Sequence, residues 1–393
     1  MRTGSRASTT VAKWVRATRL GARSILLGGA CLSFCASLSA SLQPSEVVGT
    51  PCSAPAHTLQ LPGVGLQESS SEAEEHYARA LRLQSTGDEA GAENEFKVAV
   101  TERPQEGRYV HDLALLYIKK NQYERAIEAI REYVKLCGAT ALGYELEAEL
   151  LFQRKQFEPA QIAVQRSLEL SDNNARMHEL LGLIYATKRQ DGAGVLELQK
   201  ASELDPDQPQ IRYYCARLLY STGRYEEARD QFLACLRVQP GFPRALENLG
   251  LCYEALRDDA KATEAYLEAI ALAKNSIGPK DVEAFAYYGA LLARLGQSDK
   301  ALPVLREAVA LSPKSFRANF ELGRVLLAAG HLEEAENSLL TSAHLAPNFS
   351  RTYYLLGTLR QKQNRPAEAD RYRGVFKELD KSVENREFPL TDR

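Results

Sequence analysis

Residues 213–240 read YYCARLLYSTGRYEEARDQFLACLRVQP and contain two amphipathic helical patterns joined by one tight turn. Gly223 predicts the end of the first helix. Small residues at Ala216 and Ala228 allow the two helix backbones to approach closely, while Phe232 fills the space beyond them. Because a lone pair of short helices cannot bury both of its faces, this stretch predicts further copies packed against it.

The same pattern recurs along the chain with a period of 34 residues. Nine copies run from 73–106 to 350–383, and five extra residues at 277–281 interrupt the register once. The first small position is occupied by Ala80, Ala114, Ala148, Gly182, Ala216, Gly250, Gly289, Gly323 and Gly357. The second is occupied by Ala92, Ala126, Ala160, Gly194, Ala228, Ala262, Ala301, Ala335 and Ala369. The turn glycine recurs less regularly, as Gly87, Gly223, Gly296 and Gly330.

This pattern of small, aromatic and proline residues resembles the tetratricopeptide repeat over residues 73–383. The resemblance implies an all-α, right-handed superhelical solenoid of nine tandem helix-turn-helix repeats. His76, His178 and Asn319 replace the bulky first aromatic residue of the family, and Arg373 stands where an apolar residue is expected. Because the family is defined by its architecture, function has to be argued from other features.

Two places in the array are expected to differ from the rest. Gly192 and Gly194 predict a soft second helix in repeat four, because glycine in a helix interior costs about 1 kcal/mol relative to alanine. We interpret the extension at 277–281 as a tolerated lengthening of a turn. The alternative is a flexible joint that divides the array into blocks of six and three repeats.

The N-terminal region predicts export. Residues 1–45 contain six basic residues and no acidic one, and residues 24–42 are uncharged. Residues 1–42 therefore read as a signal peptide or an uncleaved membrane anchor, with a transit peptide as the third alternative. Residues 43–72 are expected to be a flexible linker and residues 384–393 a short tail. In either of the first two cases the repeats lie outside the cytoplasm, in a periplasmic or secreted location of a bacterium.

No catalytic motif is found in the repeats. The histidines are dispersed, and neither an HxxxH pair, a CxxC pair nor a glycine-rich phosphate loop occurs. We therefore expect no enzyme activity, no cofactor and no metal ion. The cysteines within the array replace small packing residues, so free buried thiols are favoured over disulfides; they are Cys137, Cys215, Cys235 and Cys252.

The expected working surface is the concave groove formed by the first helix of every repeat, where ligands of this family usually bind. Aromatic rings supply contact area there and guanidinium groups bind carboxylates, so protein or peptide partners are expected. The predicted groove residues are Arg108, Arg176, Tyr213, Tyr214, Arg217, Tyr220, Arg244, Tyr287, Arg317, Phe320, Arg324, Arg351 and Tyr354. Repeats seven to nine carry an excess of basic groove residues, which favours an acidic segment as the ligand there.

These observations predict a non-enzymatic scaffold that binds other proteins outside the cytoplasm. The alternative is an accessory assembly subunit of an envelope machine for polysaccharide export, pili or secretion, which recruits a separate enzyme. Nucleic acid is not expected as a partner, because the formal charge of -2 combines a basic leader with a distinctly acidic remainder. Contact with a membrane is expected only through the N-terminal segment, if that segment is not cleaved.

Overall fold

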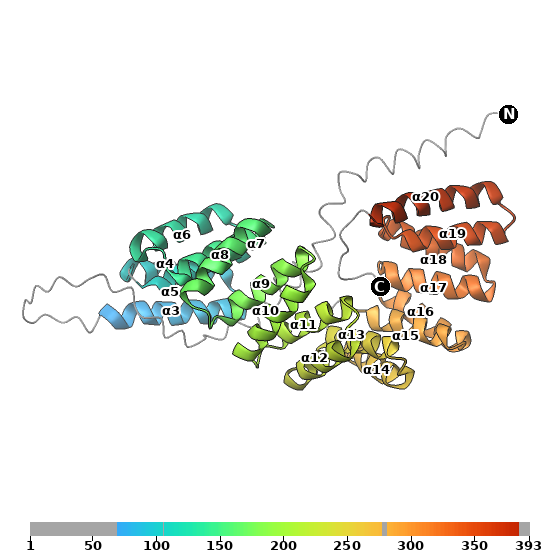
Figure 1. Ribbon diagram of the computed structural model, residues 1–393, viewed down its shortest axis with the longest axis horizontal. Coiled ribbons are helices and arrows are strands. Elements are labelled where there is room, and N and C mark those ends of the chain that lie inside the picture. The colour runs from blue at the N-terminus through green and yellow to red at the C-terminus, as the bar shows by residue number, and fades with distance from the viewer. Residues whose placement is uncertain (1–68, 105, 277–280, 385–393) are drawn as a thin grey trace, which may run out of the picture. The chain divides into compact units, whose positions relative to one another are not determined.

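The computed structural model describes residues 69–104, 106–276 and 281–384. Within these residues the chain forms eighteen helices and no strand, which confirms the all-α prediction (Figure 1). The predicted leader, the centre of the extension at 277–280 and the last residues of the tail lie outside the described residues. The first described helix begins at Ser69, so the last residues of the predicted linker are helical.

Residue contacts divide the chain into two compact units, residues 1–188 with 203–205, and residues 189–202 with 206–393. The described helices of the first unit are α3 (Ser69–Thr86), α4 (Glu89–Glu102), α5 (Gly107–Lys119), α6 (Tyr123–Cys137), α7 (Ala141–Gln153), α8 (Phe157–Leu170) and α9 (Ala175–Thr187).

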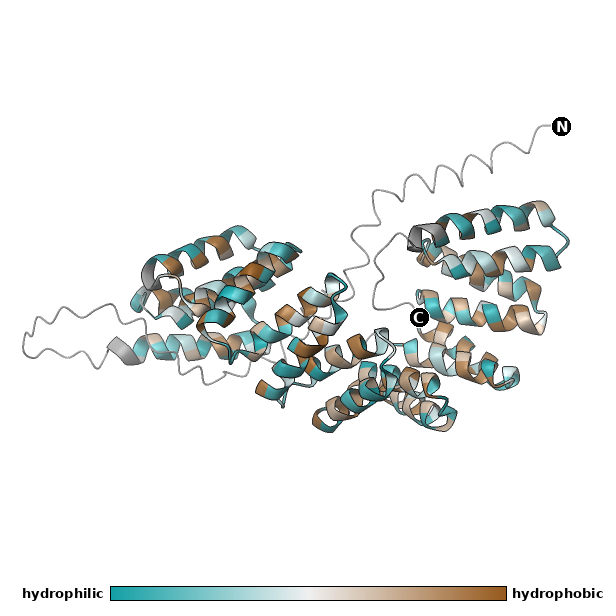
Figure 2. Cartoon of the chain, in the orientation of Figure 1, coloured by the Kyte–Doolittle hydropathy of each residue, from teal (hydrophilic) through white to brown (hydrophobic). Residues whose placement is uncertain are grey.

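The second unit contains most of α10 and all of the later helices. They are α10 (Asp191–Leu204), α11 (Pro209–Ser221), α12 (Tyr225–Val238), α13 (Pro243–Ala255), α14 (Asp259–Asn275), α15 (Glu283–Arg294), α16 (Ser298–Leu311), α17 (Phe316–Ala329), α18 (Leu332–Leu345), α19 (Ser350–Lys362) and α20 (Pro366–Glu384). The two helices of every predicted repeat are thus present in the described residues. Apolar and polar residues alternate along each helix (Figure 2), as expected where one face is buried.

The small residues of the pattern allow the two helices of a repeat to approach closely, as the sequence predicts. Large side chains of the second helix pack onto them. A Cβ atom at Gly250 would overlap the ring of Tyr266, which is fully buried. A Cβ atom at Gly289 would lie 2.5 Å from Leu305. The two helices of a repeat are therefore held closer than alanine would permit at these positions.

The turn between the two helices of a repeat has the same backbone conformation in all nine described copies. One residue there has a positive φ, between 55° and 86°. The nine residues are Gly87, Asn121, Lys155, Arg189, Gly223, Arg257, Gly296, Gly330 and Asn364. Glycine adopts this left-handed conformation freely, whereas lysine and arginine do so at a cost. The turn geometry is therefore kept even where the sequence pattern loses its glycine.

First helices of successive repeats also contact one another within each unit. In the first unit α5 contacts α7 and α7 contacts α9; in the second, the same contacts join α11, α13, α15, α17 and α19 in order. We call the side chains of α3, α5, α7 and α9 in the first unit, and of these five helices in the second, the first-helix row.

In the described residues, each helix is too short or too polar to cross a bilayer.

The extension at 277–281 is not the boundary between the units. The helix before it, α14, and the helix before that, α13, both contact α15 within the second unit. The boundary falls instead in repeat four, whose second helix carries Gly192 and Gly194. The division between the two compact units therefore falls in repeat four and not at the extension.

Candidate functional site

The predicted groove residues lie on first helices, two in the first unit and eleven in the second. Arg108 is on α5 and Arg176 on α9. The residues of the second unit are Tyr213, Tyr214, Arg217 and Tyr220 on α11, Arg244 on α13, Tyr287 on α15, Arg317, Phe320 and Arg324 on α17, and Arg351 and Tyr354 on α19.

In the first unit both predicted arginines already bind carboxylates of the same row. Arg108 donates to Glu74 at 2.6 Å, and the hydroxyl of Tyr109 donates to the same oxygen at 2.7 Å. Arg176 donates to Glu149 at 2.6 Å and to Glu179 at 2.7 Å. Both acceptors of Arg176 are almost fully buried, so this guanidinium joins neighbouring repeats.

A second polar group in the first unit surrounds His111. Its Nδ1 lies 2.8 Å from a carboxylate oxygen of Asp112, whose other oxygen accepts from the hydroxyl of Tyr77 at 2.6 Å. Burial opposes protonation of His111, but Asp112 and the nearby Glu145 and Glu149 raise its pKa. Acidic side chains therefore dominate this part of the first-helix row, with Arg176 and His111 as their partners.

Two of the predicted groove aromatics belong to the core of the second unit. Tyr213 is 4% exposed and Phe320 is 6% exposed. The ring of Tyr213 lies 5.0 Å from that of Phe242, and the ring of Phe320 lies 4.9 Å from that of Phe349. Both rings stabilise the packing between repeats, which corrects the expectation that they offer contact area to a partner.

Tyr287 lies between two other side chains of the second unit. Its ring stacks on Tyr266 with centroids 6.0 Å apart, and the guanidinium of Arg317 lies 5.1 Å from its centroid. Arg317 also donates to Glu283 at 2.7 Å. Burial raises the pKa of Tyr287, so its hydroxyl stays protonated at neutral pH. Arg317 is thus engaged both by a carboxylate and by an aromatic face.

Carboxylates are concentrated where α13 approaches α15. Glu247 of α13 is 5% exposed, and burial together with the nearby Asp281 and Glu283 raises its pKa well above the usual value. Burial also raises the pKa of Glu283, against the opposing effect of Arg317. Arg317 therefore neutralises an acid of its own chain, Glu283, which weakens the predicted positive character of the groove.

Two exposed predicted residues are on α19. Tyr354 is 55% exposed and its ring lies 5.6 Å from that of Phe376. Arg351, one helical turn earlier, is exposed and makes no hydrogen bond or ion pair with the residues that the structure describes. By contrast, Arg324 donates to Glu321 at 2.6 Å.

The other predicted residues of the second unit are partly exposed or exposed. The hydroxyl of Tyr214 accepts from Gln210 at 3.3 Å. The guanidinium of Arg217 lies 5.6 Å from the ring centroid of Tyr213. The ring of Tyr220 lies 5.3 Å from that of Tyr225 at the start of α12, and burial raises the pKa of Tyr220 to about 12. Arg244 is exposed at the start of α13.

The sequence prediction missed the acidic partners of the groove arginines. A signal for two of them was present, because Glu74 and Arg108 occupy the same position in consecutive repeats, as do Glu283 and Arg317. Opposite charges that alternate at one repeat position predict ion pairs along the row. The partners of Arg176 follow no such rule, because they come from two different repeat positions.

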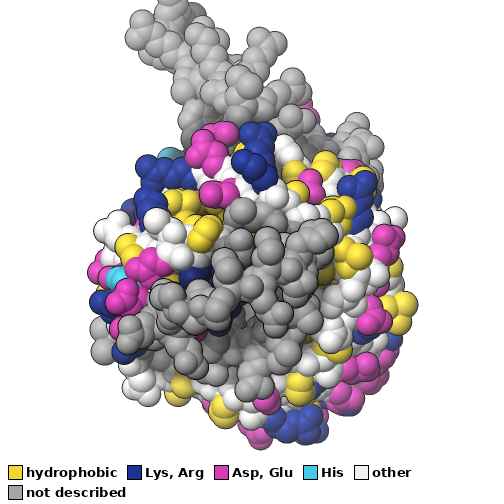
Figure 3. Space-filling model, turned by 90° about the vertical axis from the view of Figure 1, so that its left-hand side faces the viewer, with side chains coloured by type: hydrophobic (Ala, Val, Ile, Leu, Met, Phe, Trp, Pro, Cys, Tyr) yellow, Lys and Arg dark blue, Asp and Glu magenta, His cyan; other side chains and the backbone are white. Residues whose placement is uncertain are grey.

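The titratable side chains of the described residues are dispersed with respect to metal binding. No group of three or more His, Cys, Asp or Glu residues is placed to hold a metal ion within the described ranges. Cys215, Cys235 and Cys252 are buried and unbridged, and burial raises the pKa of each thiol to about 12. These thiols are therefore unreactive at neutral pH. The face presented in Figure 3 shows Lys and Arg side chains interspersed with Asp and Glu.

Family models support the repeat pattern in both units. Three models described as tetratricopeptide repeat match residues 107–140, 215–281 and 292–359. Among solved structures, the chain is similar to one in the APC/C hetero-tetramer Cut9-Hcn1, with a TM-score of 0.54 and 13% identity. That likeness covers 75% of this chain and 57% of the other, and it bears on the fold alone.

Curated relatives share parts of the chain. It is 27% identical over 150 residues to the Type IV pilus assembly protein PilF of Pseudomonas aeruginosa, which covers 38% of this chain and 55% of PilF. It is 26% identical over 262 residues to Tetratricopeptide repeat protein 37 of Xenopus laevis, which covers 62% of this chain and 16% of that protein. The chain therefore spans much less than the full length of either relative.

Proposed function

The chain is a tetratricopeptide repeat protein, and we propose that it serves as a non-enzymatic scaffold whose first-helix row binds extended peptide segments of partner proteins outside the cytoplasm. Within each unit the repeated helix pairs present a row of polar and aromatic side chains, which suits the recognition of a chain segment better than that of a small molecule. The location outside the cytoplasm rests on the basic and apolar leader.

The observation that carries the proposal is the open pair on α19. Arg351 and Tyr354 are exposed three residues apart on the same helix. No carboxylate of the described residues forms an ion pair with Arg351. An exposed guanidinium next to an aromatic ring favours a peptide that carries an acidic residue. Other predicted arginines, such as Arg317, already bind a carboxylate of this chain. To bind a peptide carboxylate, they must first release that internal partner.

Site-specific photo-crosslinking in the native cells tests this function. A photo-crosslinking amino acid at position 354 should attach to a partner protein, and the Arg351→Glu substitution should reduce the yield. The control places the same amino acid at Leu267, which is 46% exposed on a second helix. Equal products from both positions, or only cytoplasmic proteins attached at position 354, would contradict the groove or the location.

The similarity to PilF favours a second candidate function, that of an accessory assembly subunit in an envelope machine such as a pilus. The same crosslinks distinguish the two, because an assembly subunit should be attached to a few stable components of one complex. A set of varied soluble proteins would instead support a general peptide-binding scaffold.

A further inference from the structure

A chain of polar side chains crosses the first unit from α3 to α9, and His111 of α5 stands at its centre. On one side, the hydroxyl of Tyr77 on α3 donates to Asp112 of α5 at 2.6 Å. On the other side, the amide of Asn174, the N-cap residue of α9, donates to Glu145 of α7 at 2.7 Å. His111 lies between the two carboxylates, with Nδ1 2.8 Å from Asp112 and Nε2 3.9 Å from Glu145. The ring therefore joins the two halves of the chain.

The contact between His111 and Glu145 is a contact between repeats, because α5 belongs to repeat two and α7 to repeat three. The side chains of His111 and Glu145 are 18% and 15% exposed. Water therefore screens their charges less than it screens a pair on the open surface. A change in the charge of either group should alter how firmly α7 is held against α5.

The two contacts of the imidazole ring require its charged form. A neutral ring carries one N–H group and one lone pair, whereas a charged ring carries two N–H groups. Because a carboxylate faces each nitrogen, only the charged ring attracts both carboxylates at once. A neutral ring with its proton on Nδ1 keeps the contact with Asp112, but its Nε2 lone pair then faces Glu145. The loss of one proton thus removes the attraction between α5 and α7.

The other groups around His111 are mainly acidic. Burial lowers its pKa, but the carboxylates of Asp112, Glu145 and Glu149 raise it above the usual value. Glu149 of α7 is itself bound by Arg176 of α9 at 2.6 Å. The helices α4 and α6 also contact α5, but no hydrogen bond or ion pair joins their described side chains to His111. Burial raises the pKa of Glu145, and the charge of His111 opposes this effect. Each of the two groups therefore favours the charged form of the other.

A comparison with His76 of α3 shows what distinguishes His111. The ring nitrogens of His76 also lie near two carboxylates, 2.6 Å from Glu95 and 3.7 Å from Glu102. Both acids belong to α4, so these contacts stay within repeat one. The guanidinium of Arg79 also lies 3.3 Å from Nδ1 of His76, whereas no basic side chain of the described residues donates to His111. Of these two histidines, only His111 joins two repeats.

We propose that His111 is a proton-dependent link between repeats two and three, which holds α7 against α5 through Glu145 when it is charged and releases this contact when it is neutral. Because the pKa of His111 is raised above 6.5 in the folded chain, the link is complete below about pH 6.5 and is lost as the pH rises through the folded-state pKa. The link does not depend on peptide binding to the first-helix row.

Hydrogen exchange of the full chain, followed by mass spectrometry between about pH 6 and about pH 8.5, tests the proposal. Protection factors remove the intrinsic pH dependence of exchange. For the amides of α7 they should fall at least about threefold over this range, because the ion pair is lost. Glu145→Gln should remove most of this fall. Glu147→Gln makes the same change at an exposed position of α7 and should keep it in full.

Nuclear magnetic resonance of the chain with ¹³C-labelled histidine rings measures the charge directly. The signal of His111 is identified by its absence from His111→Gln. It should titrate above about pH 6.5 in the unaltered protein and at a lower pH in Glu145→Gln. Circular dichroism verifies that each variant is folded. A ring that titrates at or below pH 6.5 would overturn the proposal. So would α7 amides whose protection depends on pH equally in Glu145→Gln and in the unaltered protein.

Discussion

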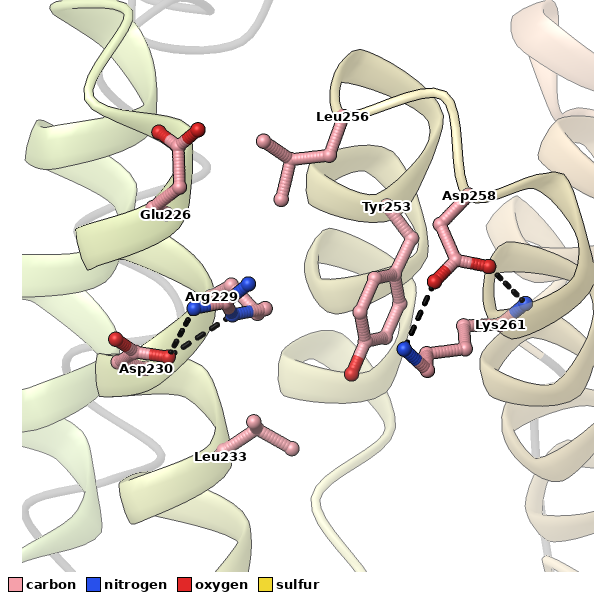
Figure 4. A pocket seen from close by; sticks show the side chains of 8 residues that line it. All are labelled: Glu226, Arg229, Asp230, Leu233, Tyr253, Leu256, Asp258 and Lys261. Carbon is pink, nitrogen blue, oxygen red and sulfur yellow. Dashed lines mark hydrogen bonds and ion pairs between the residues drawn. The ribbon is translucent and has the colours of Figure 1, made fainter.

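Glu93 and Arg229 occupy the same position in two repeats, four periods of 34 residues apart. The junction around Glu93 is filled, whereas Arg229 lines an open cleft between α12 and α13–α14, together with Tyr253 and Lys261 (Figure 4). At Glu93 a single carboxylate, 10% exposed, collects three cations from its own helix and the next repeat. At Arg229 the sign of this side chain is reversed. Arg229 pairs with the adjacent Asp230, and Lys261 pairs with Asp258, the N-cap residue of α14. One repeat position therefore either joins two repeats or leaves a cleft open between them.

The largest effect is expected at another filled junction. Arg360 is 7% exposed at its side chain, binds both oxygens of Glu336 at 2.6 Å and lies 3.1 Å from Glu368. Because Arg360→Ala leaves Glu336 without its cation and Glu368 with only the half-exposed Arg365, we expect a loss of about 3 kcal/mol of unfolding free energy. Urea denaturation followed by circular dichroism measures it.

Arg365→Ala is the matched control, since Arg365 is half exposed and binds only Glu368 in the described residues. Its effect should stay within about 0.5 kcal/mol. Equal effects of the two substitutions would show that the filled junctions do not hold the repeats together.

A smaller loss is expected for Glu93→Ala. The substitution removes the common partner of Lys97 and Lys120, and a charged hydrogen bond contributes about 1.5–3 kcal/mol. We expect a loss of about 2 kcal/mol by urea denaturation. Glu128→Ala, at an exposed position of α6, should change stability by less than about 0.5 kcal/mol. A value near zero for Glu93→Ala would remove the contrast with the cleft.

The same carboxylate predicts a pH dependence. Burial opposes its ionisation, but hydrogen bonds from Lys120 and Lys97 lower the pKa of Glu93 from 4.5 to about 2. The folded chain therefore binds fewer protons than the unfolded chain between these values. The stabilisation is complete above about pH 4.5 and is lost as the pH falls toward 2.

Urea midpoints at pH 6 and pH 3.5 test this prediction. The difference between the two midpoints should be larger for the unaltered protein than for Glu93→Gln, whose amide does not titrate. An identical pH dependence in both proteins would show that Glu93 is not the group responsible.

The smallest effect is expected from converting the open site into a filled one. Arg229→Glu places a carboxylate opposite Lys261 and Tyr253, as Glu93 is placed opposite Arg125. Because the pair is exposed, only a slight rise in the urea midpoint is expected, well below the change for Glu93→Ala. A clear decrease would mean that Arg229 has a structural role and that the two junctions are not equivalent.

The fold was predictable because it depends on a few positions that repeat. Ala216, Ala228 and Phe232 predicted the close helix pair, and the structure buries all three completely. Sequence spacing places such residues on helix faces without any knowledge of the tertiary structure. The boundary between the units was not predicted, because Gly192 and Gly194 indicated only a soft helix and not where contacts diminish.

The candidate site was less predictable, because its properties depend on pairs of side chains from different repeats. The family pattern placed Tyr213 and Phe320 at groove positions, but neighbouring rings at Phe242 and Phe349 cover them. Similarly, Arg317 reads as a free cation in the sequence, while Glu283 neutralises it in the structure. The exposed surface depends on such neighbours, and they become visible only when repeats are compared position by position.

The identity of the left-handed turn residue makes some repeats easier to unfold locally than others. Lys155, Arg189 and Arg257 hold a conformation that costs such side chains roughly 1 kcal/mol each, whereas Gly223 adopts it freely. In a chain whose repeats contact only their neighbours, such local costs remain local. Amide hydrogens beside these three turns should therefore exchange with solvent sooner than those beside Gly223. Repeats three, four and six are then the places where the array first loosens, and where a single change to glycine would tighten it.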